Sequence, residues 1–154
     1  KYSPSEKASQ LIINLIITDN EEISVRNALK NLGFDVSIKR QKHWEIEIDE
    51  ESATILNDIN KSGELFNSNK EHIREIEKAD GGISILVRKK DDIHGRIKHE
   101  TLKNRFGIEG IKKITSGVIW NLSSNKSNIR SEINEILNTN ILHNPLSHEC
   151  YKIN

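Results

Sequence analysis

The second half of the chain repeats the residue pattern of the first half, with a period of about 75 residues. Three landmarks recur in the same order: residues 31–34 (NLGF) correspond to 105–108 (RFGI), Trp44 corresponds to Trp120, and 65–72 corresponds to 141–148, with a histidine closing both stretches. Agreement in order, length and landmark residues is stronger evidence for an internal repeat than any single motif would be. Two very small halves can bury a core only if they share surface, so we expect the two copies to pack against each other.

Each half shows the element order strand, helix, strand, strand, helix, strand. In the first half these elements are expected at residues 11–18, 19–32, 34–39, 43–49, 52–60 and 70–77, with a turn at 40–42. In the second half they are expected at 83–88, 96–106, 110–115, 118–122, 129–137 and 147–153. Asp19 and Glu22 have the spacing of a helix capping box, and Trp44, Ile46 and Ile48 alternate with acidic residues as on a strand with one apolar face. The predicted fold class is therefore α+β, with two tandem ferredoxin-like βαββαβ halves, each a four-stranded antiparallel sheet with two helices.

The repeat also gives the expected domain boundaries. Residues 1–10 are expected to form a polar tail, 11–78 the first repeat, 79–82 a linker and 83–154 the second repeat. The linker is assigned from the glycine pair that follows a short polar stretch. The two sheets could cover each other's open faces or join at their edges.

The composition of the chain limits the cell compartments and the kinds of binding partner that we expect for it. Lysine and arginine number 23, and aspartate and glutamate also number 23, so no overall charge draws the chain to nucleic acid or acidic lipid. The longest apolar run, residues 11–17, is shorter than the ~20 residues that a membrane helix needs. Cys150 is the single cysteine, which excludes an intramolecular disulfide and is typical of a reducing compartment. We therefore expect a cytoplasmic protein without a membrane segment.

Four short motifs of the second half point to a known family. In chain order they are Asp92-Ile93-His94-Gly95, Phe106-Gly107-Ile108, Ile114-Thr115-Ser116-Gly117 and Leu142-His143-Asn144-Pro145. Together they resemble the motifs of PurS, the small subunit of phosphoribosylformylglycinamidine synthase, although His94 replaces the usual proline and the third motif lacks its arginine. The first half is a weaker copy that keeps Leu32-Gly33-Phe34. The resemblance implies a tandem PurS in one chain, paired like a PurS dimer and similar to the amino-terminal domain of the large single-chain synthase.

This resemblance also implies a function. The family's complex converts formylglycinamide ribonucleotide to its amidine in purine synthesis, using ATP and ammonia that a glutaminase releases from glutamine. The chain would be a non-catalytic subunit that joins a small PurL-type synthetase to a PurQ-type glutaminase and aids ammonia transfer. We expect no catalytic residue, metal or cofactor in this chain, since ATP, magnesium and glutamine are used by the complex. Self-association is a further option, and neither a membrane nor nucleic acid is an expected partner.

The motifs also select the residues of interest. The candidate partner-interface residues are Asp92, His94, Gly95, Ser116, Gly117, Asn144, Pro145 and His148. Trp44 and Trp120 are candidate core anchors, because a tryptophan on the apolar face of a strand usually fixes the packing of helix on sheet.

Three alternatives follow from the same residues. An RNA-binding protein with tandem RNA-recognition modules would have the same element order and would stack bases on Trp44 and Trp120, but neither first strand offers an aromatic partner. A pair of ferredoxin-like regulatory domains would bind a small effector where the halves meet. His148 and Cys150 could form a metal pair or a nucleophile, but no four-ligand pattern accompanies them, so an edge strand with ordinary polar side chains is the favoured interpretation.

Overall fold

The computed structural model describes residues 8–16, 18–49, 53–76, 81–125 and 128–153. Their helices and strands are β1 (Ala8–Leu15), α1 (Asn20–Asn31), β2 (Val36–Ile48), α2 (Ala53–Ser62), β3 (Glu71–Ile73), β4 (Ile83–Lys89), α3 (Ile93–Asn104), β5 (Ile111–Ser124), α4 (Ile129–Asn138) and β6 (His148–Ile153). The order β-α-β-α-β therefore occurs twice. None of the described helices is both long and apolar enough to cross a membrane.

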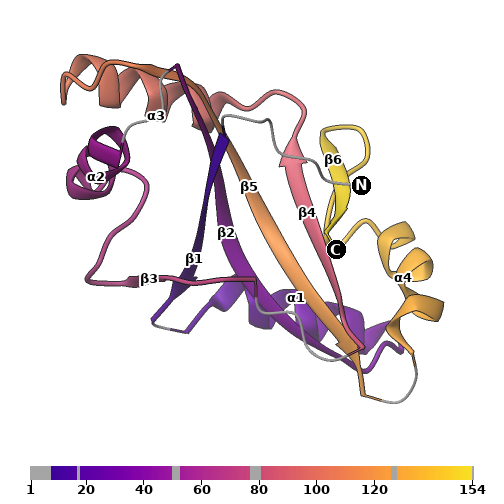
Figure 1. Ribbon diagram of the computed structural model, residues 1–154. Coiled ribbons are helices and arrows are strands. Elements are labelled where there is room, and N and C mark those ends of the chain that lie inside the picture. The colour runs from indigo at the N-terminus through magenta and orange to yellow at the C-terminus, as the bar shows by residue number, and fades with distance from the viewer. Residues whose placement is uncertain (1–7, 17, 50–52, 77–80, 126–127, 154) are drawn as a thin grey trace.

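The described strands form one sheet in the order β3-β1-β2-β5-β4-β6, and each pair of neighbours is antiparallel (Figure 1). This sheet and the four described helices confirm the predicted α+β class. The two halves join through β2 and β5, which pair along their full length at the centre of the sheet. The first strand, β1, lies between β2 and β3, so it is an inner strand as its apolar sequence indicated.

The two expected hairpins are absent, because each pair of predicted short strands is one long strand. The segment 40–42 continues β2 and the segment 116–117 continues β5. Arg-Gln-Lys at 40–42 offers none of the usual turn residues, and each of the three is paired with a residue of the neighbouring long strand. Gly117 allows close packing instead of a turn, since a Cβ there would lie 2.9 Å from Leu86 Cδ1. Two expected four-stranded sheets thus become one sheet of six strands in the described residues.

Other element boundaries differ by a few residues. Helix α3 begins at Ile93 rather than at 96, because Asp92 caps its first turn. Strand β3 keeps only three residues of the expected 70–77. The start of the expected helix at 52 lies outside the described residues. The predicted cap at Asp19 is confirmed, since its side chain accepts a hydrogen bond from Glu22 N at 3.2 Å.

The pairing of β2 with β5 is symmetric about one residue pair. Lys42 lies opposite Val118, Trp44 lies opposite Ser116, and Arg40 lies opposite Trp120. Each tryptophan therefore stands two residues beyond the central pair on its own strand. Rotation about this point exchanges the two tryptophans, which is the geometry expected when equivalent strands of two similar halves pair with each other.

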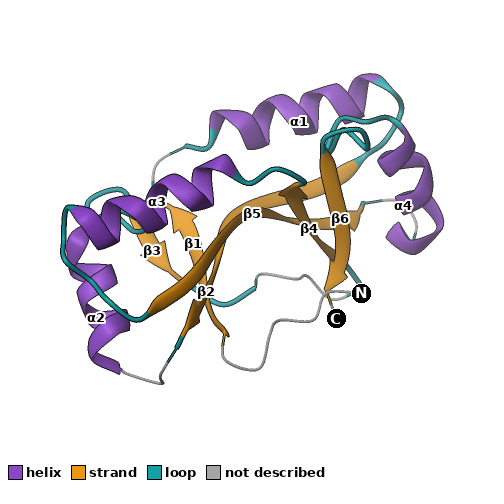
Figure 2. Ribbon diagram, turned by 90° about the horizontal axis from the view of Figure 1, so that it is seen from above, coloured by secondary structure: helices purple, strands orange, loops and turns teal. Residues whose placement is uncertain are grey.

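The helices cover one face of the sheet in two groups (Figures 1 and 2). Leu29 of α1 packs in one core with three isoleucines of α4 and with the apolar residues of β4. Leu102 of α3 packs in a second core with Ile59 of α2 and with residues of β1. The first helix of each half therefore packs on the long strand of its own half and shares a core with the second helix of the other half. Each of these leucines is fully buried, and such burial contributes roughly 2 kcal/mol, so the two shared cores are a substantial part of the stability.

The opposite face of the sheet carries a row of buried polar side chains. Ser84 Oγ donates to Asn121 Oδ1 at 2.5 Å, and Asn121 Nδ2 donates to Gln41 Oε1 at 2.8 Å. Gln41 Nε2 in turn donates to Asn14 Oδ1 at 2.7 Å. All four residues are buried, and the row crosses the four strands β4, β5, β2 and β1. Partnered in this way, the polar groups meet the condition under which such groups are tolerated in a core.

Candidate functional site

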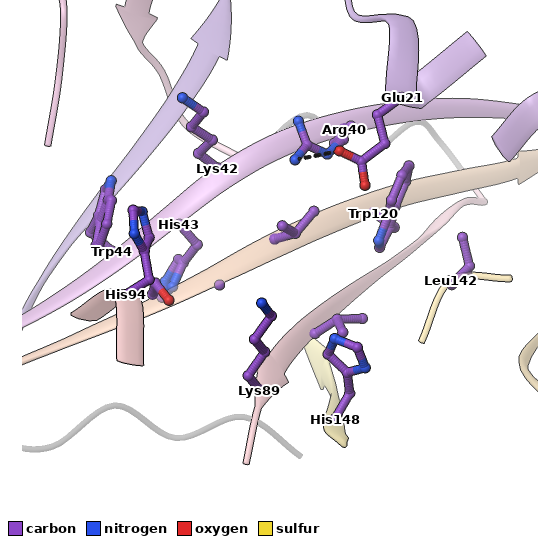
Figure 3. A pocket seen from close by; sticks show the side chains of 14 residues that line it. Glu21, Arg40, Lys42, His43, Trp44, Lys89, His94, Trp120, Leu142 and His148 are labelled. Atoms are coloured by element: carbon purple, nitrogen blue, oxygen red, sulfur yellow. Dashed lines mark ion pairs between the residues drawn. The ribbon is translucent and has the colours of Figure 1, made fainter. Parts of the chain in front are cut away.

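A cavity of about 380 Å³ lies at the centre of the sheet on the helix-covered face. Lys42 and Val118, the central pair of β2 and β5, both line it, so it sits where the two halves meet. Figure 3 shows Trp44 and His94 towards one end and Trp120 and Leu142 towards the other. The cavity occupies the gap between the two helix-side cores, because the apolar rows of β2 and β5 are interrupted by polar residues at this point.

The start of α3 forms one side of the cavity. Asp92 Oδ1 accepts hydrogen bonds from Gly95 N at 3.0 Å and from Ser116 Oγ at 2.5 Å, and Asp92 Oδ2 accepts from Ser116 N at 2.8 Å. A side chain at Gly95 would overlap the carbonyl oxygen of Ile114. The carboxylate therefore caps the helix and ties it to β5, and Gly95 permits the close approach. Three residues selected from the sequence thus meet in one place.

The start of α1 repeats this arrangement in the other half. Asp19 pairs with Arg40 of β2 at 3.2 Å, and Glu21 pairs with the same guanidinium at 3.0 Å (Figure 3). Glu22 Oε1 accepts from Arg40 N at 2.7 Å, so its carboxylate does not complete the expected capping box. Each half therefore uses the aspartate at its first helix to hold the middle of its long strand. The two helix starts stand on the same side of the sheet (Figure 2).

Both tryptophans contribute to the cavity wall. Trp44 and Trp120 are only 5% and 3% exposed, because they lie on the helix-covered face. The His94 ring lies 5.2 Å from the Trp44 ring, and the Arg40 guanidinium lies 6.0 Å from the Trp120 ring. Trp44 Nε1 is buried and has no hydrogen-bond partner in the described part of the chain. Each indole is therefore reached only from the cavity, and neither is displayed on the sheet surface as the base-stacking aromatics of an RNA-recognition module are.

His148 enters the cavity from the end of a turn. Its Nδ1 accepts a hydrogen bond from Asn144 N at 3.1 Å, which places the proton of the neutral ring on Nε2. Asn144 Oδ1 accepts from Leu146 N at 3.0 Å, and Asn144 O accepts from Ser147 N at 3.0 Å, with Pro145 exposed in the same turn. The Asn-Pro motif therefore orients His148 and does not itself line the cavity.

Two histidines near the cavity are shifted towards the neutral form. Burial, followed by the charge of Lys98, lowers the pKa of His94, and the Asp92 carboxylate opposes this shift in part. Burial, with a smaller effect of Arg88, lowers the pKa of His43 from 6.5 to about 4. Both rings are therefore neutral near pH 7 and can each donate one hydrogen bond.

Some cavity residues were not recognised from the sequence. Arg40, Lys42 and Lys89 belong to basic clusters that are usually read as solvated strand ends. Arg40 and Lys42 instead lie in the middle of β2 and line the cavity, together with Lys89 from the end of β4. The only signal in the sequence is their clustering, and a single chain cannot separate that signal from surface charge.

His148 and Cys150, the alternative metal pair or nucleophile, lie on strand β6. Burial raises the pKa of the Cys150 thiol, which keeps it protonated near neutral pH, and the thiolate is the nucleophilic form. In the described part of the chain, no group of three or more His, Cys, Asp or Glu side chains is arranged to hold a metal ion. The pair has the surroundings of an ordinary strand.

The cavity is rich in hydrogen-bond donors and has an apolar end, which suits binding of a ligand. Glu21, its one carboxylate, is paired with Arg40. No protein-family model and no curated protein matches this chain. Its function is therefore inferred from the sequence motifs and from the geometry.

Proposed function

We propose that this chain is a non-catalytic assembly subunit of phosphoribosylformylglycinamidine synthase, with two PurS-like ferredoxin halves paired as in a PurS dimer. It joins a small PurL-type synthetase to a PurQ-type glutaminase in the cytoplasm and aids the passage of ammonia between them. ATP, magnesium and glutamine are used by the complex and not by this chain. The enzyme activity is that of a glutamine-dependent carbon–nitrogen ligase, to which this subunit contributes no catalytic residue.

One observation carries the proposal. The motif at 92–95 and the motif at 114–117 are separate in the sequence, yet Asp92 accepts hydrogen bonds from both the backbone and the side chain of Ser116. Residues that a family resemblance selects independently are expected to meet in space if the resemblance reflects a shared architecture. The symmetric pairing of β2 with β5 supports the same reading, because it is how two equivalent subunits would join.

An exposed apolar surface beside these motifs supports a docking role. Leu146 at the tip of the Asn-Pro turn is 87% exposed, and Ile93 and Ile97, one turn apart on α3, are each 53% exposed. Lys90 N donates to Ser147 O at 2.9 Å, which holds the turn next to the start of α3. Exposed apolar side chains of this kind serve as anchors in protein interfaces.

Assembly is tested by size-exclusion chromatography of the chain with a PurL-type synthetase and a PurQ-type glutaminase from the same source, with glutamine and ADP present. We expect one peak that contains all three chains. Leu146→Lys should weaken this complex. Leu32→Lys, which changes another exposed leucine at the end of α1, should leave it intact. Failure of the unaltered chain to co-elute under these conditions overturns the assembly role.

Ammonia transfer is tested separately with the same three chains. We expect the chain to raise amidine formation from glutamine while leaving the reaction supported by added ammonium unchanged, because a closed path keeps ammonia from bulk water. An equal rise with both nitrogen sources would mean that the chain acts on the synthetase itself and not on transfer.

A further inference from the structure

The central cavity has the size and position of a ligand site. Its volume of about 380 Å³ falls within the range of small-molecule pockets, roughly 300–1,000 Å³. Strands β2, β4, β5 and β6 and the starts of both first helices contribute to its wall. A molecule bound here would touch both halves of the chain.

One part of the cavity is a group of hydrogen-bond donors. Lys89 and His148 are directly opposite each other on β4 and β6, and Figure 3 shows them side by side. Side chains at opposed positions start about 5 Å apart, so both can reach the same group. His148 carries its proton on Nε2, since Nδ1 accepts from Asn144 N. Lys42 and His94 line the same cavity from β2 and α3.

The charge of Lys89 is not compensated within the described residues. Lys42 pairs with Glu71 at 2.7 Å, and Arg40 pairs with Asp19 and Glu21. No ion pair within that part of the chain involves Lys89. Asp92, the cap of α3, accepts hydrogen bonds from Gly95 and Ser116 through its two carboxylate oxygens. Lys89 is exposed, so its ammonium is free to pair with an anionic ligand at the mouth of the cavity.

The other part of the cavity is apolar. It is lined by four side chains that also pack in the core formed by α1 and α4, namely Val87, Val118, Trp120 and Leu142. A flat or compact ring would bury apolar area against this wall.

We propose that the cavity binds a small phosphate monoester that carries a ring, with the phosphate at Lys89 and His148 and the ring against Trp120 and Leu142. The three N–H groups of the Lys89 ammonium and the Nε2–H of His148 suit the three terminal oxygens of a phosphate better than the two oxygens of a carboxylate. This ligand site goes beyond the assembly role and does not depend on it.

Binding is tested on the full chain by intrinsic fluorescence, because both of its tryptophans line the cavity. The probes are phenyl phosphate, AMP and UMP, with inorganic phosphate, adenosine and benzoate as comparisons, and calorimetry gives the affinities. We expect a saturable change with at least one ring-bearing phosphate. The comparison compounds, which lack the ring, the anion or the phosphate, should bind at least about tenfold more weakly. No saturable change with any of the three phosphates, or equal binding of benzoate, overturns the proposal.

Two lysine variants locate the site. Lys89→Gln should weaken binding of the phosphate probe about tenfold, while Lys112→Gln, the same charge change at an exposed position of β5, should leave it unchanged. Lys89 is itself exposed, so the melting temperature of both variants should match that of the unaltered chain. Equal weakening by both substitutions would mean nonspecific attraction of the anion and would also overturn the site.

Discussion

At the scale of single residues, the helix-capping residues form the local hydrogen bonds that their spacing predicts. They also form hydrogen bonds with residues that are distant in the sequence. The cap at Asp19 follows from the spacing of Asp19 and Glu22, and the side-chain contact forms. The carboxylate of Glu22 instead accepts from Arg40 N, a residue 18 positions away. Asp92 was selected from the sequence, whereas its bonds to Ser116 depend on where β5 lies. Capping residues are therefore predictable, and their tertiary partners are not.

Substitution of Asp92 tests the importance of this cap. Asp92→Ala removes the helix cap and leaves Ser116 N without its acceptor, so the free energy of unfolding should fall by about 2 kcal/mol. The neighbouring Asp91→Ala removes only a highly exposed pair with Arg96 and should change it by less than about 0.5 kcal/mol. Urea denaturation of both variants measures the difference. Equal effects would contradict the assigned role.

His43 should make the stability depend on pH. Its pKa is about 4 in the folded chain against 6.5 when unfolded, so the unfolded chain binds the proton more readily below pH 6.5. This contribution is complete above pH 6.5 and is lost as the pH falls, by about 2 kcal/mol between about pH 6.5 and about pH 5. Melting curves of the unaltered chain should show this loss. His43→Gln, which keeps a hydrogen-bonding group near Gln10, should show a smaller dependence.

At the scale of elements, the helices and strands β1, β4 and β6 were predicted to within a few residues, whereas β2 and β5 were each predicted as two strands. The helical spacing of Ile129, Ile133 and Ile136 places their side chains in the core, and all three are buried. The predicted hairpins at 40–42 and 116–117 are wrong, because alternation of apolar and polar residues marks a strand without saying where it ends. Ser116-Gly117 resembles a turn in sequence, yet its glycine serves close packing against Leu86.

Because each first helix shares a core with elements of the other half, a substitution in one half should destabilise elements of the other. Leu29→Ala should lower the free energy of unfolding by about 2–5 kcal/mol and should increase hydrogen exchange in α4 and β4, which share its core. Leu102→Ala should do the same in α2 and β1. Exchange mass spectrometry on both variants distinguishes these patterns. Increased exchange confined to the half that carries the substitution would contradict the assigned packing.

At the scale of the whole molecule, the cavity could not be derived from the sequence. Its lining depends on the register of β2 against β5 and of β4 against β6, which brings Lys42 to Val118 and Lys89 to His148. Periodicity gives the face of a side chain but not its partner across the sheet. The sequence indicated that the halves would pack together, and it left open whether they would cover each other or join at their edges.

The shared cores also predict that neither half is stable alone. Residues 8–76 would lack the covering of α3, and residues 81–153 would lack that of α1. Separately expressed segments should show little cooperative unfolding by circular dichroism, and mixing them should restore it. Cooperative unfolding of either segment by itself would contradict this expectation.

The polar row from Ser84 through Asn121 and Gln41 to Asn14 has a consequence for how the strands align during folding. Sliding one long strand by two residues keeps every side chain on its original face. Hydrophobic contacts alone therefore give such a shifted register only a small cost in free energy. The same slide would separate the interior amides and leave their donors and acceptors stranded away from water. The hydrogen bonds among these four side chains therefore favour one strand register over several others that would otherwise be close in energy.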